Sequence, residues 1–204
     1  MEQIKKKKRN KVIRLIFGIL LLTVIGAGIF LYKTAFQPFS LSETVYIHIN
    51  KEKDYEEVVR QLKEKANLPS EKIFRMLAER MNYPNKVKTG RYSIEDGITM
   101  PDVIRRLRSG NQAPVNLTFN NIRTGENLAG RLSQQLMVDS LSLLQAIDNP
   151  ANAEKFGFNH YTFVSMFIPN TYEVYWDTNI DNLLNRMKKE YDFFMRFSRL
   201  SMFV

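Results

Sequence analysis

The first long hydrophobic stretch of the chain has no polar face. Residues 15–32 read LIFGILLLTVIGAGIFLY, which is 18 residues without a charged side chain. Together with Val12 and Ile13, this stretch reaches the length at which an α-helix crosses the hydrocarbon of a bilayer. We therefore predict a transmembrane helix over residues 15–32, followed by a connector over residues 33–44.

Beyond the connector, the hydrophobic positions take the periods of a folded domain. Alternation over residues 45–49 is typical of a half-buried strand and places His48 on the outer face of that strand. Asp54 and Ser70 are N-cap residues, and each precedes an apolar stripe with helical spacing. A strand around Tyr92 then returns the chain to the first strand. The predicted order is strand, helix, helix, strand.

A second set of elements follows. A third helix is expected from Thr99 to a C-capping Gly110. Residues 115–119 alternate as another strand, and further helices are predicted after Thr124 and after Thr178, with a short helix between them. Helices and strands in this order predict an α+β fold in two parts.

Charge is concentrated at the N-terminus. Lys and Arg number 30 and Asp and Glu number 21, a formal net charge of +9. Residues 1–14 hold seven basic side chains and one acidic side chain, or +6, which leaves +3 for residues 15–204. Under the positive-inside rule this basic leader stays in the cytoplasm, so we expect a single-pass inner (cytoplasmic) membrane protein with an extracytoplasmic C-terminal part. The competing interpretation is a cleaved signal peptide, whose apolar region is usually shorter and ends at a small-residue cleavage site.

The amino-acid composition excludes several classes of functional site. Because cysteine is absent, the chain has no thiol nucleophile, disulfide or thiolate metal ligand. His48 and His160 are 112 positions apart, and neither has a second ligand at metal-site spacing, so we expect no metal and no cofactor. The body outside the leader is almost balanced in charge, and a nucleic-acid partner is therefore not expected.

Three short motifs follow one another behind the predicted anchor. They are Lys88-Thr89-Gly90-Arg91-Tyr92, Leu107-Arg108-Ser109-Gly110 and Pro169-Asn170-Thr171-Tyr172-Glu173. The last is moderately specific, and the order and spacing of the three strengthen it. In this combination the chain, over about residues 1–192, resembles the YceG-like family, the endolytic murein transglycosylases of the MltG type.

The resemblance implies a division of the chain. A LysM-like strand–helix–helix–strand module with its following helix would occupy residues 45–110, and the N-terminal part of a transglycosylase domain would occupy residues 111–192. Residues 193–204 read FFMRFSRLSMFV, in which 8 of 12 are apolar. We interpret this segment as an aberrant apolar tail of a truncated or frameshifted chain.

The implied activity is the cutting of nascent peptidoglycan strands to leave 1,6-anhydro-N-acetylmuramic ends. Breaking a glycosidic bond requires a carboxylic acid that protonates the leaving oxygen. If the sugar's own 6-hydroxyl attacks, one carboxyl group serves first as acid and then as base. The resemblance places that glutamate in a segment like S-I-V-E-K-E-T, which does not occur before Val204. We therefore assign no catalytic residue and expect the chain as written to be inactive.

The candidate substrate-proximal residues lie around the last motif. They are Asn170, Thr171, Tyr172, Glu173 and Tyr175. The motif gives Glu173 no catalytic role. Tyr175 and Trp176 have rings that can stack on sugars, although aromatic rings beside a buried turn are more often part of a core. Both interpretations of this aromatic pair stay open.

Three functions remain in competition. The chain is a peptidoglycan transglycosylase by descent, a membrane-anchored module that holds peptidoglycan glycan strands without cutting them, or a structural partner of the division or elongation machinery. The last would use the anchor and the apolar tail as contact surfaces for partners such as cell-wall synthases.

Overall fold

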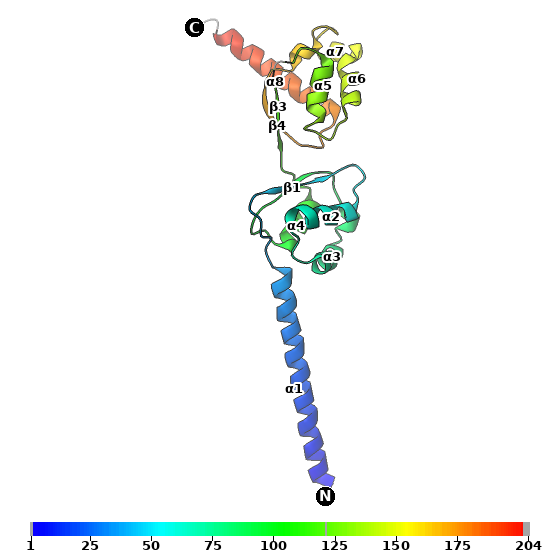
Figure 1. Cartoon of the computed structure of the whole chain (residues 1–204), viewed down its shortest axis with the longest axis vertical. Helices are drawn as coiled ribbons and strands as arrows, with labels where there is room; N and C mark the ends of the chain where they lie inside the picture. Colours follow the sequence, from blue (N-terminus) through cyan, green and yellow to red (C-terminus); the bar gives the residue numbers. More distant parts are fainter. Residues whose placement is uncertain (1, 121, 202–204) are drawn as a thin grey trace.

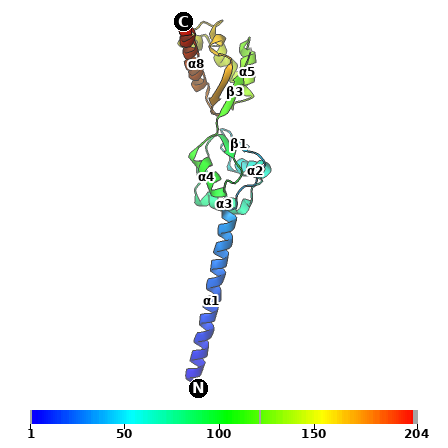
Figure 2. The same cartoon turned by 90° about the vertical axis from the view of Figure 1, so that its left-hand side faces the viewer.

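A long N-terminal helix carries two small lobes. The computed structural model describes the backbone of residues 2–120 and 122–201, with side chains over residues 15–30, 32–120 and 122–196. Helix α1 (Glu2–Ala35) leads into a first lobe over residues 36–113, and a second lobe occupies residues 114–201. The first lobe sits on the C-terminal end of α1 and the second lobe lies beyond it in both views (Figure 1, Figure 2).

The first lobe has the predicted order of strand, helix, helix, strand. Its elements are β1 (Val45–Ile49), α2 (Tyr55–Ala66), α3 (Glu71–Arg80), the 3-10 turn η1 (Pro84–Lys86), β2 (Gly90–Ile94) and α4 (Met100–Ser109). The two strands form an antiparallel ribbon in which Ile47 is opposite Tyr92. The return of the second strand to the first is thereby confirmed.

Short polar side chains and one glycine set the helix ends. Asp54 Oδ1 accepts a hydrogen bond from the Glu56 N–H at 2.9 Å, and Ser70 Oγ accepts one from the Ile73 N–H at 3.5 Å. These bonds satisfy N–H groups that have no partner within the helix. Gly110 ends α4 with a φ of 79°, a left-handed conformation that glycine adopts without strain.

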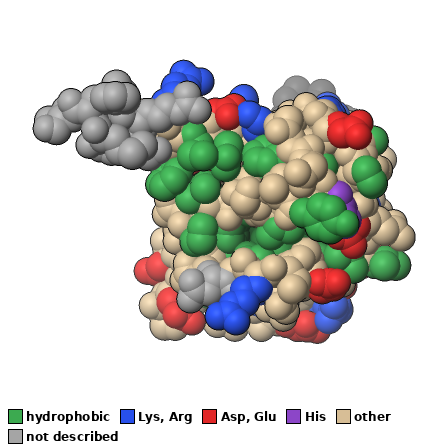
Figure 3. Space-filling model, turned by 90° about the horizontal axis from the view of Figure 1, so that it is seen from above, with side chains coloured by type: hydrophobic (Ala, Val, Ile, Leu, Met, Phe, Trp, Pro, Cys, Tyr) green, Lys and Arg blue, Asp and Glu red, His purple; other side chains and the backbone are tan. Residues whose placement is uncertain are grey.

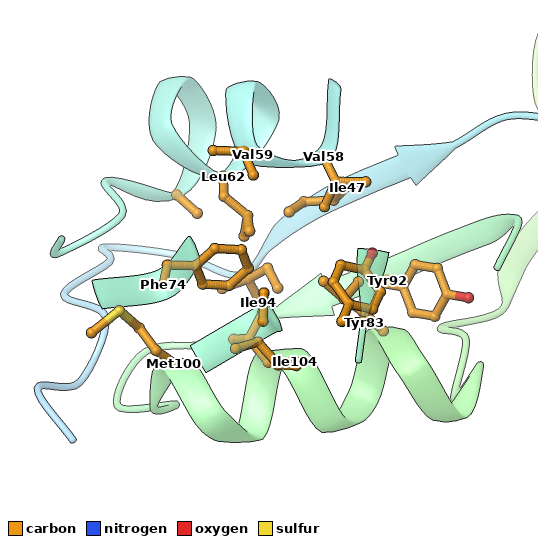
Figure 4. Close-up of a cluster of buried hydrophobic side chains, with 14 of the residues drawn as sticks. Ile47, Val58, Val59, Leu62, Phe74, Tyr83, Tyr92, Ile94, Met100 and Ile104 are labelled. Carbon is orange, nitrogen blue, oxygen red and sulfur yellow. The ribbon is translucent and has the colours of Figure 1, made fainter. Parts of the chain in front are cut away.

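The core of the first lobe lies between the helices and the inner face of the ribbon. Figure 4 shows Leu62 of α2, Ile47 of β1 and Ile104 of α4 in this cluster, and all three side chains are 0% exposed. Burying an aliphatic side chain of this size stabilises a fold by about 1.5–3 kcal/mol. The inward-facing residues of β1 and the apolar stripes of α2 and α4 therefore form one core.

The outer edge of β1 is closed by one side chain. Gln61 of α2, only 6% exposed, accepts a hydrogen bond from the His48 N–H at 3.1 Å and donates one to the His48 carbonyl at 2.8 Å. The amide of Gln61 thus imitates a neighbouring strand, and it satisfies backbone groups that an edge strand otherwise leaves unpaired.

The connector after α1 is part of the first lobe. Phe39 is 1% exposed, its N–H donates to the Ile98 carbonyl at 2.9 Å, and its carbonyl accepts from the Gly97 N–H at 3.0 Å. Ala35, the last residue of α1, is also buried. The end of α1 is therefore packed against the lobe without a free linker between them.

The second lobe is built around another antiparallel ribbon. Its elements are β3 (Val115–Phe119), α5 (Gly125–Ser133), α6 (Ser140–Asp148), α7 (Pro150–Lys155), the 3-10 turn η2 (Phe163–Met166), β4 (Asn170–Val174) and α8 (Ile180–Ser201). Leu117 and Tyr172 are opposite each other and face a core completed by Leu183 and Met187 of α8. Gln135 donates to the Thr118 carbonyl and accepts from the Thr118 N–H, both at 3.0 Å, and so closes the edge of β3 as Gln61 closes that of β1.

Several elements differ from the prediction. Residues 170–174, which we did not predict as a strand, form β4, and Asn149 caps a second short helix, α7, which we did not predict. Asn179, rather than Thr178, caps α8, because its Oδ1 accepts from the Asn182 N–H at 2.7 Å. Helix α8 continues to Ser201 through most of the predicted apolar tail, while residues 202–204 and the side chains of the basic leader lie outside the described residues.

Replacing Gln61 by alanine is expected to lower the free energy of unfolding by about 1–3 kcal/mol, because the part-buried N–H and carbonyl of His48 lose their partner. Urea unfolding of the full chain in detergent, followed by circular dichroism, measures the change. Glu64→Ala is the matched control on α2, since the exposed Glu64 carboxylate makes a surface ion pair with Arg60 at 3.0 Å. Equal losses in the two variants would contradict the role given to Gln61.

Candidate functional site

The outer face of the β3–β4 ribbon is polar and open to solvent. The register places Asn116 opposite Glu173 and Thr118 opposite Thr171, and all four residues are exposed. The hydroxyl oxygens of Thr118 and Thr171 lie 2.9 Å apart. Because side chains alternate across a strand, this polar face is the counterpart of the apolar face that makes the core.

The structure divides the predicted substrate-proximal residues between this face and the core. The exposed ones are Asn170, Thr171, Glu173 and Tyr175. Tyr172 is only 5% exposed, its ring stacks on Phe119 with centroids 5.5 Å apart, and its hydroxyl donates to the Ile168 carbonyl. Burial raises the pKa of Tyr172, so this hydroxyl remains a donor. Tyr172 therefore supports the ribbon from inside.

An open groove of about 390 Å³ runs beside the polar face. It is lined by Pro114, Glu173, Val174, Tyr175, Thr178 and Arg186. Arg186 Nε donates to Glu190 Oε1 at 2.7 Å, a bond that orients the guanidinium on α8. Glu173 offers acceptors, Arg186 offers donors and the Tyr175 ring, 57% exposed, offers an apolar surface. This combination suits a ligand with hydroxyl and amide groups on a partly apolar ring.

The lobes are joined by the two residues that follow Tyr175 in the chain. Trp176 meets the ring of His48 edge-on, with centroids 4.9 Å apart. Asp177 Oδ2 accepts hydrogen bonds from Thr89 Oγ1 at 2.7 Å and from Gln112 Nε2 at 3.1 Å. Trp176 is therefore half-buried at the junction, and of the predicted aromatic pair only Tyr175 presents a mostly exposed ring.

The contact between the lobes has no signature in the sequence. Thr89 and Asp177 are 88 positions apart, and no local pattern relates a polar residue before β2 to one after β4. His48 does lie on the outer face of β1, as predicted, but Trp176 covers part of that face. The predicted position of His48 on the outer face of a strand was the one available signal, and it does not identify a partner.

The pKa of His48 is lowered at the contact between the lobes. Burial lowers the pKa of His48 below the ordinary value of 6.5, and the positive charges of Lys65 and Arg91 lower it further. Arg91 is held over the ring of Tyr46, 3.4 Å from the centroid. The neutral imidazole is therefore the form that the packed junction favours.

A second open groove lies in the first lobe. It spans about 1240 Å³ and its basic lining residues are Lys86, Lys88, Arg105, Arg106 and Arg108. Arg105 pairs with Asp102 at 2.8 Å and Arg106 with Glu95 at 2.9 Å, so part of this charge is neutralised within the groove. Among the residues that the structure describes, no group of three or more histidine or carboxylate side chains converges on a point where a metal ion would be held.

Acidification is expected to loosen the junction. Because the folded state lowers the pKa of His48, the stability linked to this residue is fully present above pH 6.5 and is lost as the pH falls through the lowered pKa. Trp176 is the single tryptophan, so its fluorescence reports on this contact. We expect a fluorescence transition with a midpoint below pH 6.5 that His48→Gln abolishes. An unchanged transition in His48→Gln would refute the assignment.

Comparison with known proteins places both lobes in one family. The sequence model of the YceG-like family matches residues 47–200. No curated protein matches the chain. The crystal structure of a YceG-like protein from Listeria monocytogenes aligns with a TM-score of 0.42 and 16% sequence identity, covering 78% of this chain and 58% of that one. The chain thus spans somewhat more than half the length of that protein.

The match to the family model begins within β1 and ends in the last turn of α8, so it spans both lobes and the groove between β4 and α8. It covers well over half of the chain. The chain belongs to the YceG-like family.

Proposed function

We propose that this chain is a membrane-anchored protein of the lytic transglycosylase type that acts on peptidoglycan glycan strands. The observation that carries the proposal is the continuity of one apolar helix with the family region. Residues Leu15–Ala35 form the one helix, among the described residues, that is long and apolar enough to cross a membrane, and the YceG-like match begins at residue 47. The proposed activity is endolytic cleavage that leaves 1,6-anhydro-N-acetylmuramic ends.

The surface of α1 supports its role as an anchor. Its apolar side chains are exposed along the span, among them Leu22 at 69% and Phe30 at 69%, so no part of the described protein covers them. Such a surface is stable in lipid and costly in water. With the basic leader on the cytoplasmic side, the two lobes lie outside the inner membrane, where peptidoglycan is found.

The groove of the second lobe supplies ligand contacts in this proposal. Glu173 lies on an exposed strand face beside Arg186, so we give it hydrogen bonding to sugar hydroxyl or amide groups, and we assign proton transfer to no residue of the chain. The Tyr175 ring packs on the apolar face of a sugar. The S-I-V-E-K-E-T-like segment that would contain the catalytic glutamate does not occur in these 204 residues.

A non-catalytic function is the second candidate, and a specific observation favours it. The described residues form a groove with hydrogen-bond donors, acceptors and the exposed ring of Tyr175, which are the contacts that hold a sugar chain. A peptidoglycan-binding module has these properties. A scaffold for cell-wall synthases would instead use exposed apolar side chains, which Figure 3 shows on the second lobe. Phe193 and Phe194 of α8 are 69% and 49% exposed.

Tyr175→Ala is expected to weaken the binding of the full chain to purified peptidoglycan by roughly two- to tenfold, since an aromatic contact contributes about 0.5–1.5 kcal/mol. Co-sedimentation in detergent measures the affinity. Tyr161→Ala is the matched control, because Tyr161 is 91% exposed in the same lobe and does not line the groove. Equal affinities of Tyr175→Ala and the unaltered chain would contradict the assignment of the groove.

The same preparation separates the two candidate functions. Release of soluble products with 1,6-anhydro ends from sedimented peptidoglycan indicates a transglycosylase. Binding that depends on Tyr175, without such products, indicates the binding module. Two results together indicate the scaffold. Tyr175→Ala keeps both its binding to peptidoglycan and its co-purifying synthases, and Phe193→Ser loses the synthases.

A further inference from the structure

We infer that the exposed face of α3 is a docking surface for anionic phospholipid headgroups, which holds the first lobe directly on the membrane. This inference rests on the proposed membrane anchoring by α1. It concerns a different surface from the groove of the second lobe, and it names lipid as the partner.

The length of the span fixes the height of the first lobe. The segment Leu15–Ala35 contains 21 residues, which at 1.5 Å per residue is about 30 Å, the thickness of the hydrocarbon layer. Tyr32 and Phe36, whose rings lie 4.7 Å apart, are exposed at its C-terminal end, where aromatic residues mark the interface. Ala35 therefore lies at the boundary between hydrocarbon and headgroups.

Helix α3 is the part of the first lobe that this boundary brings against the bilayer. It contacts α1 directly, and both views show it as the element of the lobe nearest to the end of α1 (Figure 1, Figure 2). Because Ala35 and Phe39 are buried, the lobe cannot move away from the membrane on a flexible tether. We therefore place the surface of α3 that faces away from the core at headgroup depth.

The composition of that surface suits headgroups. The buried residues of α3, Phe74 and Ala78, face the core, and the exposed residues lie on the opposite side of the helix. These exposed residues are Lys72, Met76, Glu79 and Arg80. Met76 is 43% exposed on α3 although it is apolar, and two cations surround it against one carboxylate.

The cations of this surface are available to lipid. No salt bridge joins Lys72 or Arg80 to a carboxylate within the side chains that the structure describes, whereas Arg75 of the same helix binds Glu56 at 2.7 Å and Glu71 at 3.0 Å. Lys33 of α1 adds a further positive charge at the interface. Basic side chains around an apolar one are typical of a helix that lies at a membrane interface. The basic side chains attract anionic lipid and so give the surface its preference for that lipid.

The absence of cysteine allows a direct test with the full chain. Met76→Cys carries a single fluorophore, and the protein is reconstituted into vesicles of phosphatidylcholine alone or with phosphatidylglycerol, each containing a headgroup nitroxide quencher. We expect strong quenching that increases with phosphatidylglycerol. Tyr161→Cys, in the second lobe, is the control and should remain unquenched. Lys72→Glu combined with Arg80→Glu should remove the increase, and Lys72→Arg with Arg80→Lys should keep it.

Flotation of the vesicles separates this inference from the proposed anchoring. If the labelled chain floats with the vesicles and Met76→Cys is quenched no more than Tyr161→Cys, the docking of α3 is wrong and the anchoring stands. If quenching does not depend on phosphatidylglycerol, the anionic partner is wrong. If the chain does not float at all, both the anchoring and the docking are refuted.

Discussion

A ribbon of two antiparallel strands cannot stand alone in water, and the architecture of this chain follows from that constraint. Each lobe has one such ribbon, and in each lobe helices cover its inner face. In each ribbon a side-chain amide pairs with the backbone of an edge strand. Gln61 does so at His48 of β1, and Gln135 does so at Thr118 of β3. Without these helices and amides, the strands would expose apolar side chains and unpaired backbone groups.

Covering one face of each ribbon leaves the other face available for contacts outside the core. The first lobe uses its outer face at the junction, where His48 meets Trp176. The second lobe keeps its outer face open, with Glu173 and Tyr175 beside a groove. The chain that leaves β4 passes from this groove to Asp177 at the junction within a few residues, so the groove and the contact between the lobes share one short segment.

Local signals predicted most of the elements, and long-range contacts account for what they missed. Caps at Asp54, Ser70 and Gly110 act within a few residues, so the helices that they bound were predictable. Strand β4 was not, because its short polar-apolar alternation becomes meaningful only against β3. Once β4 is known, the alternation of the motif places Glu173 on the exposed face. The place of Asp177 at the junction could not be predicted, because its partner Thr89 lies 88 positions earlier.

The claim on which the functional account depends is that glycan strands bind along the outer face of the β3–β4 ribbon. Hydrogen–deuterium exchange of the full chain, with and without soluble peptidoglycan glycan strands, tests it at the level of single segments. The account predicts slower exchange over residues 170–178 and around Pro114 when glycan is present, with little change in α6 and α7. Protection that is confined to the first lobe, or no protection anywhere, would contradict it.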